Sequence, residues 1–155
     1  MFLQFRWQLR RMMWNDRTCG RHALNKLLQG ANFTDDDMAR IQLRTASSVL
    51  EDAALHGDPR GDWSIEVLGH ALRSKGFDMQ MRIPAAGQTI AGMLGDSQGM
   101  LNWVGAHYFA YIRHSGAVYR LDSASSSVKM GCPPCRHTFC SRTLCVLVHR
   151  ASEAR

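Results

Sequence analysis

The sequence predicts an α+β fold in which an N-terminal helical part is followed by an antiparallel sheet. Between residues 18 and 75, apolar side chains recur at the spacing of helix faces. After Gly76, apolar and polar residues alternate in short runs separated by turn residues, as in strands. Helices gathered before strands, rather than alternating with them, indicate the α+β class. We expect one domain, 1–155, large enough to bury a hydrophobic core.

Helices are predicted over three segments of the N-terminal half. The segment 18–29 carries alanine and leucine on a single face. The segment 34–50 begins with three aspartates, which the positive end of a helix dipole favours. The segment 64–75 has isoleucine and leucine at helical spacing and ends before a glycine. Between the last two, Gly, Pro and Asp predict a loop over 56–62.

Strands are predicted mainly in the second half, where β-branched, aromatic and methionine residues alternate with polar ones. A turn over 114–116 joins two of them into a hairpin. The predicted strands are 77–82, 100–104, 108–112, 117–121 and 143–149, with a short helix over 88–93 and an edge strand within 1–14.

Composition argues against several classes of function. Lysine and arginine outnumber acidic residues by 19 to 13, for a net charge of +6, but they are scattered, so nucleic acid is not an expected partner. No apolar run approaches the roughly 20 residues of a membrane span. Arginines at positions 6, 10 and 11 interrupt the N-terminus, so no signal peptide is apparent. We expect an intracellular monomer, cytoplasmic or nuclear, with reduced thiols.

Cys19 is the first candidate for chemistry because it lies at the predicted start of a helix. The unpaired N–H groups and the dipole at that end favour a thiolate over a thiol. The backbone N–H of Cys19 is also available to a developing oxyanion, and Gly20 leaves room beside the sulfur. The alternative is an inert buried cysteine.

A nucleophilic cysteine needs a base, and His107 is better placed for this than His22, which shares the helix of Cys19. His107 opens one predicted strand and Asp122 closes the next. With the turn centred near Ser115, the pairing brings His107 and Asp122 within about one residue of opposite each other. An aspartate beside a histidine fixes the tautomer and stabilises the imidazolium. A chance surface pair is the alternative, but its conjunction with Cys19 favours a catalytic triad.

The segment 18–29, Thr-Cys-Gly-Arg-His-Ala-Leu-Asn-Lys-Leu-Leu-Gln, resembles the nucleophile helix of the Josephin family, with its Cys-x-x-His-x-Leu-Asn pattern. The resemblance implies a papain-like cysteine protease fold. It also implies a thiol-dependent deubiquitinase that hydrolyses isopeptide bonds at the C-terminal glycine of ubiquitin. The implied partner is ubiquitin or polyubiquitin, and no cofactor is expected. Further blocks resemble the family in order at 33–34, 62–77, 107–109, 119–123 and 144–148.

The sequence departs from the family in two places. The family usually has a glutamine five residues before the cysteine, where it completes the oxyanion hole, and here that position is Trp14. Asn15 is the nearest amide and becomes the candidate for the second oxyanion donor. The segment around 34–62, which in the family is a longer helical arm that flanks ubiquitin, is shortened.

The resemblance also assigns candidate ubiquitin-binding residues, Ile65, Glu66 and Lys75. Ile65 lies at core spacing, so packing is the competing interpretation. Trp63 and Trp103 are large aromatics near the proposed cleft. Either of them can wall a narrow channel for the Gly-Gly tail of ubiquitin, or pack in the core.

A cluster of cysteines near the C-terminus is not explained by the resemblance. Four potential zinc ligands fall within nine residues, but their spacing is tighter than in most zinc sites. We expect a loop with free thiols and no bound metal, and a buried strand position for Cys145. The four candidate ligands are Cys132, Cys135, His137 and Cys140.

Three other functions remain open from the sequence. A papain-like leader peptidase that cleaves Gly-Gly peptides uses the same residue types. A ubiquitin-binding pseudoenzyme is motivated by the missing glutamine. A basic nucleic-acid binder is the weakest of the three and predicts salt-sensitive binding.

Overall fold

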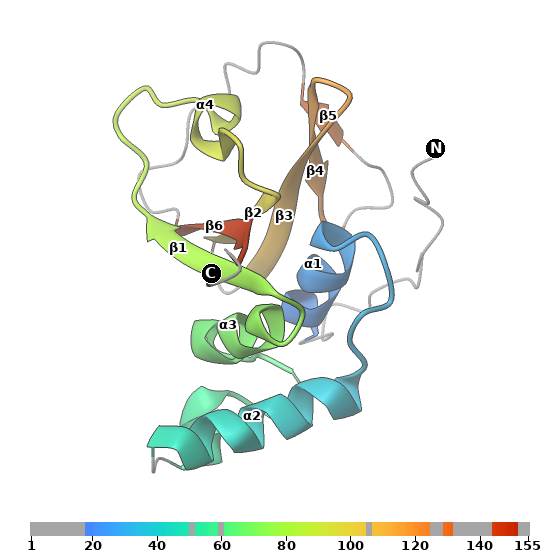
Figure 1. The fold of residues 1–155 in the computed structure, drawn as a ribbon, viewed down its shortest axis with the longest axis vertical. Helices are drawn as coiled ribbons and strands as arrows, with labels where there is room; N and C mark the ends of the chain where they lie inside the picture. The colour runs from blue at the N-terminus through green and yellow to red at the C-terminus, as the bar shows by residue number, and fades with distance from the viewer. Residues whose placement is uncertain are drawn as a thin grey trace.

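A computed structural model describes residues 18–49, 52–58, 61–104, 107–124, 129–131 and 144–151. The helices precede most of the sheet, so the predicted α+β class is confirmed (Figure 1). The helices are α1 (Cys19–Leu27), α2 (Asp35–Val49), the 3₁₀ helix η1 (Ala53–His56), α3 (Ile65–Arg73) and α4 (Ile90–Leu94). The strands are β1 (Phe77–Arg82), β2 (Gly99–Val104), β3 (His107–His114), β4 (Ala117–Leu121), β5 (Lys129–Gly131) and β6 (Leu144–Arg150).

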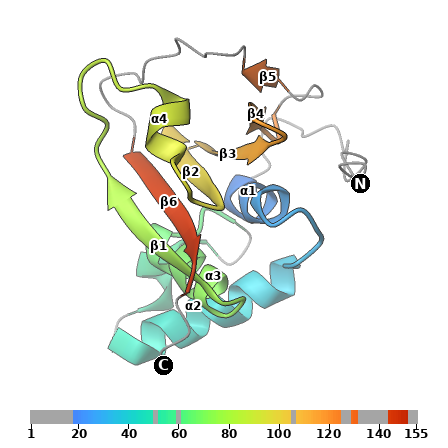
Figure 2. The same cartoon turned by 45° about the horizontal axis from the view of Figure 1, so that its top comes forward.

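The described strands form one six-stranded sheet in the order β1-β6-β2-β3-β4-β5. Every neighbouring pair is antiparallel. The last strand, β6, lies inside the sheet between β1 and β2, as Figure 2 shows. Strand β6, from the C-terminal part of the chain, therefore joins β1 to the four other described strands.

Helices α1 and α3 pack on one face of the sheet, and α2 lies on the far side of α3 (Figure 1). The main core is made of leucines of α1 and α3 and of inward-facing residues of β2, β3, β4 and β6. Successive strand residues point to opposite faces of the sheet. Met100 and Leu147 therefore face away from the main core and pack with α4 in a second, smaller cluster. The main core includes Leu24, Leu27, Val67, Leu68, Leu72, Leu101, Ala110 and Val146.

The three aspartates predicted to begin a helix occupy the first turn of α2. The Asp37 carboxylate accepts hydrogen bonds from the backbone N–H and the hydroxyl of Thr34, and the Thr34 hydroxyl accepts from the Asp37 backbone N–H at 3.1 Å. This reciprocal arrangement is a capping box. The backbone and side-chain bonds from Thr34, helped by Arg40, lower the pKa of Asp37 to about 2.

Several details differ from the sequence predictions. The predicted loop at 56–62 begins with His56 inside the 3₁₀ helix η1, and the short strand β5 was not predicted. The hairpin turn is tighter than expected, because Ser115 and Gly116 both adopt positive φ and form a two-residue turn. The predicted edge strand within 1–14 lies outside the described residues. None of the described helices has the length and apolar character needed to span a bilayer.

Candidate active site

Cys19 is the first residue of α1 and is 4% exposed. Thr18 occupies the N-cap position and makes no side-chain capping bond to the helix. The backbone N–H of Tyr108, at the start of β3, donates to the Cys19 sulfur at 3.4 Å. Gly20, directly after the cysteine, lets α1 pack closely on α3, because a Cβ at this position would lie 3.1 Å from Leu68.

His107 and Asp122 meet at one end of the β3–β4 hairpin. Nε2 of His107 lies 2.7 Å from Oδ1 of Asp122. Ala110 pairs with Leu121, and continuing this register puts Asp122 two residues from the position opposite His107. The prediction of about one residue was wrong by a single step, because the turn centre falls between Ser115 and Gly116 rather than at Ser115. The contact is therefore a diagonal one, which long side chains can span.

The histidine lies between the sulfur and the carboxylate. Its hydrogen bond with Asp122, followed by that with Cys19, raises the pKa of His107 to about 9 against the opposing effect of burial. Because Nε2 faces Asp122, Nδ1 is the ring nitrogen left for the sulfur. His107 is 30% exposed at the side chain, so solvent reaches it. A protonated imidazole at neutral pH is thus held between the Cys19 sulfur and the Asp122 carboxylate.

Asp122 is held at four points. Its Oδ1 accepts from His107 and from the Ala124 backbone N–H at 3.0 Å, and its Oδ2 accepts from Arg120 at 2.7 Å. Its backbone carbonyl accepts from Nζ of Lys26, on α1, at 2.8 Å. Burial alone would raise the pKa of Asp122, but the bonds from His107, Ala124 and Arg120 outweigh it and hold the pKa below its usual range. Asp122 is therefore ionised throughout the pH range in which His107 gains or loses its proton.

Sequence reasoning missed Arg120, Lys26 and the Tyr108 N–H. Arg120 lies on β4 two residues before Asp122, which directly follows the strand, so period-two alternation could have found it. Lys26 follows Cys19 by seven residues, which places the two on one side of α1. Burial lowers the pKa of Lys26, and the charge of Asp122 opposes that effect.

The candidate ubiquitin-binding residues have different surroundings. Glu66 is exposed on α3, and its charge contributes, after burial and Cys19, to a Tyr108 pKa of about 12. Ile65 is partly buried against the core. Lys75 is exposed and lies with its Nζ 5.5 Å from the ring centroid of Phe33. Trp63 is 1% exposed, so of the two interpretations left open for it the structure shows core packing, and its candidacy as a ubiquitin-binding residue is corrected.

Trp103 does reach the surface beside the site. Trp103 and Val104 are 42% and 41% exposed at the end of β2. Val104 pairs with His107, so an exposed apolar residue lies beside the histidine, whereas Trp103 pairs with Tyr108 and points to the other face of the sheet.

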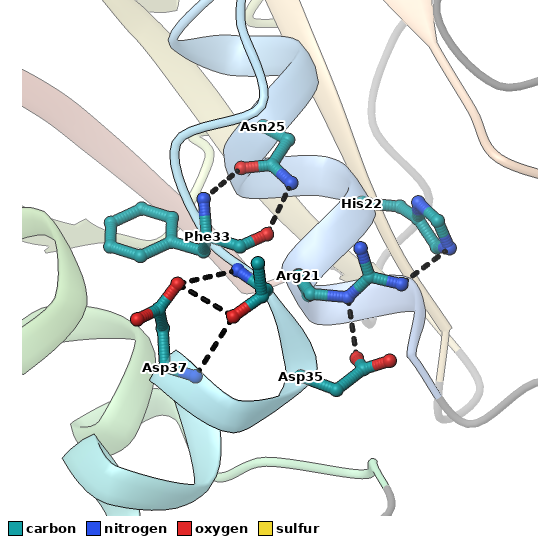
Figure 3. Close-up of polar contacts among 7 residues, drawn as sticks. Arg21, His22, Asn25, Phe33, Asp35 and Asp37 are labelled. Atoms are coloured by element: carbon teal, nitrogen blue, oxygen red, sulfur yellow. Dashed lines mark hydrogen bonds and ion pairs between the residues drawn. The ribbon is translucent and has the colours of Figure 1, made fainter.

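The other side of α1 faces the segment that leads into α2, as Figure 3 shows. The Asn25 amide makes two bonds to one residue: its Oδ1 accepts from the Phe33 N–H and its Nδ2 donates to the Phe33 carbonyl, both at 2.9 Å. Nε of Arg21 lies 2.6 Å from the Asp35 carboxylate, and Nη2 of Arg21 lies 3.3 Å from Nε2 of His22. The asparagine of the Cys-x-x-His-x-Leu-Asn pattern therefore fixes the loop after the helix.

Two groups of predicted residues lie outside the described part of the chain. They are the oxyanion candidate Asn15 and the cluster of Cys132, Cys135, His137 and Cys140. Among the residues that are described, no group of three or more His, Cys, Asp or Glu could hold a metal ion.

The remaining described cysteine lies away from the site. Cys145 is buried in β6, as expected, and its thiol donates to Asn102 Oδ1 at 2.9 Å. Burial raises the pKa of the Cys145 thiol to about 12, so this cysteine stays protonated.

A cysteine at the start of a helix, packed against an antiparallel sheet whose adjacent strands supply a histidine and an aspartate, is the arrangement of papain-like cysteine proteases. The family model named Josephin matches residues 15–131, and the chain belongs to the Josephin family. This family is papain-like, and its members are generally cysteine-protease deubiquitinases. No curated protein matches the chain.

Proposed function

We propose that the chain is a thiol-dependent deubiquitinase that hydrolyses isopeptide bonds at the C-terminal glycine of ubiquitin. The observation that carries the proposal is the position of His107, which contacts Asp122 through Nε2 and interacts with the Cys19 sulfur. Family membership supports ubiquitin as the partner. The proposal includes an intracellular location, in the cytoplasm or nucleus, because a thiol nucleophile must stay reduced.

In the first step, the Cys19 thiolate attacks the carbonyl carbon of the ubiquitin C-terminal glycine. The carbonyl electrons move to oxygen, and the backbone N–H of Cys19, with Asn15 as a second donor, stabilises the oxyanion. The intermediate collapses, the C–N bond breaks, and His107 gives its proton to the departing lysine amine. The products are a thioester on Cys19 and a free amine.

In the second step, neutral His107 removes a proton from water, and the hydroxide adds to the thioester carbonyl. The C–S bond then breaks, which releases ubiquitin with a free carboxylate and regenerates the thiolate. Asp122 remains ionised throughout and orients the ring. The Tyr108 N–H, 3.4 Å from the sulfur, stabilises the thiolate before it attacks and again when it is released.

The exposed residues near the histidine suit an extended peptide tail. Val104, which pairs with His107, is an exposed apolar residue beside the histidine, and Trp103 is exposed next to it on β2. We propose that they contact the tail of ubiquitin that leads to Cys19, while Glu66, Ile65 and Lys75 contact its globular part. Trp63 has no such role because it is buried.

The test is labelling by ubiquitin that carries a C-terminal electrophile, together with turnover of an isopeptide-linked di-ubiquitin. Cys19→Ala should lose both activities completely, because the attacking atom is gone. Cys145→Ala is the matched control: it removes a buried thiol from β6 and should keep both activities.

The outcomes separate the competing functions. Ubiquitin binding by the wild type without labelling indicates a pseudoenzyme. Hydrolysis of short Gly-Gly peptides without hydrolysis of di-ubiquitin indicates a leader peptidase. Undiminished turnover by Cys19→Ala would rule out the assignment of the nucleophile.

A further inference from the structure

Arg120, on β4, makes two contacts that lead to the candidate active site. Its Nη2 donates to Oδ2 of Asp122 at 2.7 Å. Its guanidinium carbon also lies 4.0 Å from the ring centroid of Phe109 on the neighbouring strand, which is a close cation–π contact. A single side chain therefore binds both the carboxylate and the aromatic ring beside the histidine.

Phe109 connects Arg120 to His107 by a second route. The Phe109 and His107 rings are stacked at an interplanar angle of 28°, with centroids 6.3 Å apart. Phe109 is 6% exposed, and Tyr111 meets its ring edge-on at 5.6 Å, so the ring is confined on another side. Arg120, Asp122, His107 and Phe109 thus form a closed circuit in which each residue contacts two others.

We propose that Arg120 is a positioning residue that holds Oδ1 of Asp122 against Nε2 of His107. This inference rests on the proposed function. The carboxyl group of an aspartate turns easily about its last torsion. With Oδ2 bound to Arg120, Oδ1 is the oxygen that faces His107. Phe109 in turn keeps the guanidinium in place, because a planar cation can lie over a ring and donate from its edge at the same time.

The direction in which the pKa of His107 changes when Arg120 is replaced distinguishes a positioning role from a purely electrostatic one. If Arg120 acted only as a nearby cation, its removal would raise the pKa of His107, since a repelling charge would disappear. If Arg120 holds the carboxylate in place, its removal lowers the pKa of His107, because the bond to Asp122 is the largest cause of its elevation. The other charged or titratable groups at the site are Cys19 and Lys26 of α1, Tyr108 of β3 and Glu66 of α3.

The experiment is an NMR titration of the His107 ring in the full chain, compared with Arg120→Gln and Arg120→Lys. In Arg120→Gln the midpoint should fall by about one pH unit from the wild-type value. The kcat for a fluorogenic ubiquitin substrate should fall about tenfold, with KM little changed, because one charge-assisted bond is lost. Arg120→Lys keeps the charge without the planar fork and should recover part of both values.

Arg113→Gln is the matched control, since Arg113 lies on β3 and donates to the Ala91 carbonyl away from the site. Thermal unfolding checks that each variant is folded. If Arg120→Gln does not fold, Arg120→Lys carries the test, because any fall in its midpoint reports lost geometry at constant charge. A midpoint that stays unchanged or rises overturns the proposal. The titration uses no substrate, so its result does not depend on the proposed function. A wild type that is inactive on ubiquitin would refute the proposed function, and the titration would still test whether Arg120 positions Asp122.

Discussion

Helix α1 takes part in two polar networks that face different parts of the molecule. Toward the β3–β4 hairpin, Cys19 and Lys26 meet His107 and Asp122. Toward the segment before α2, Asn25 binds the backbone of Phe33 (Figure 3). The hairpin network concentrates ionisable groups around one histidine. The amide of Asn25, by contrast, satisfies one donor and one acceptor of the backbone.

The difference shows that a shifted pKa does not by itself mark a functional site. The pKa of Asp37 is lowered to about 2 by its capping bonds, in a region without a nucleophile. The pKa of His107 is raised to about 9 by groups that belong to a reaction: an anion on one side and a sulfur on the other. What distinguishes the hairpin network is the chemistry of the partners. Mutations should therefore affect rate at the hairpin and stability at the Asn25 loop.

Among the residues that surround the nucleophile, the largest effect on rate is expected from Asp122→Ala. In the wild type, the rate should fall as pH rises through about 9, because His107 then loses the proton that the leaving amine needs. Removing the carboxylate lowers the pKa of His107, so this fall should move to lower pH. At neutral pH, kcat/KM should drop about 100-fold. A pH series of initial rates on a ubiquitin substrate measures both effects.

Asp122→Asn provides the matched control, since its carbonyl oxygen still accepts a hydrogen bond from Nε2. It should lose less activity than Asp122→Ala while showing a similar downward move of the high-pH limb, because the charge is absent in both. A high-pH limb that stays at its wild-type position in both variants would contradict the assigned role of Asp122.

A smaller effect, on stability rather than rate, is expected from Asn25→Ala. The change removes the side-chain acceptor of the Phe33 N–H and the side-chain donor to the Phe33 carbonyl. Because Phe33 is 3% exposed, the free energy of unfolding should fall by about 2 kcal/mol. Urea denaturation measures this change, and kcat per folded molecule should stay within about threefold of the wild type. Gln80→Ala, which removes an exposed amide from β1, should change stability by less than about 0.5 kcal/mol. A large loss of kcat in folded Asn25→Ala would remove the distinction between the two networks.

The sequence was informative where contacts are local. The helix of Cys19 follows from apolar spacing, and the convergence of His107 and Asp122 follows from the length of one hairpin. The error in their register came from the turn. The sequence predicts the centre of the turn at Ser115, whereas the centre lies half a residue later, between Ser115 and Gly116. A half-residue shift of the turn centre moves the predicted partner of each strand residue by one full residue.

Contacts between distant elements were harder to predict. The sequence could not predict which of Trp63 and Trp103 is buried, because burial depends on which distant elements pack against each side chain. In the structure Trp63 lies in the core and Trp103 is exposed. Lys26 has the position of an ordinary surface residue at the end of a helix. Its bond to the Asp122 carbonyl, 96 residues away, depends on how α1 lies across the hairpin.

Lys26 links the two regions, and Lys26→Met should have the smallest effect. Methionine keeps the apolar stem but loses the bond to the Asp122 carbonyl, so the free energy of unfolding should fall by about 1 kcal/mol. The kcat should fall about threefold, since the backbone of Asp122 is held less firmly while its carboxylate keeps its other partners. Urea denaturation and initial rates measure the two changes, and Lys26→Arg, which keeps a cationic donor, should restore part of both. If Lys26→Met lost as much activity as Asp122→Ala, the backbone link from α1 would be as important for the rate as the carboxylate, and the site would extend along the helix.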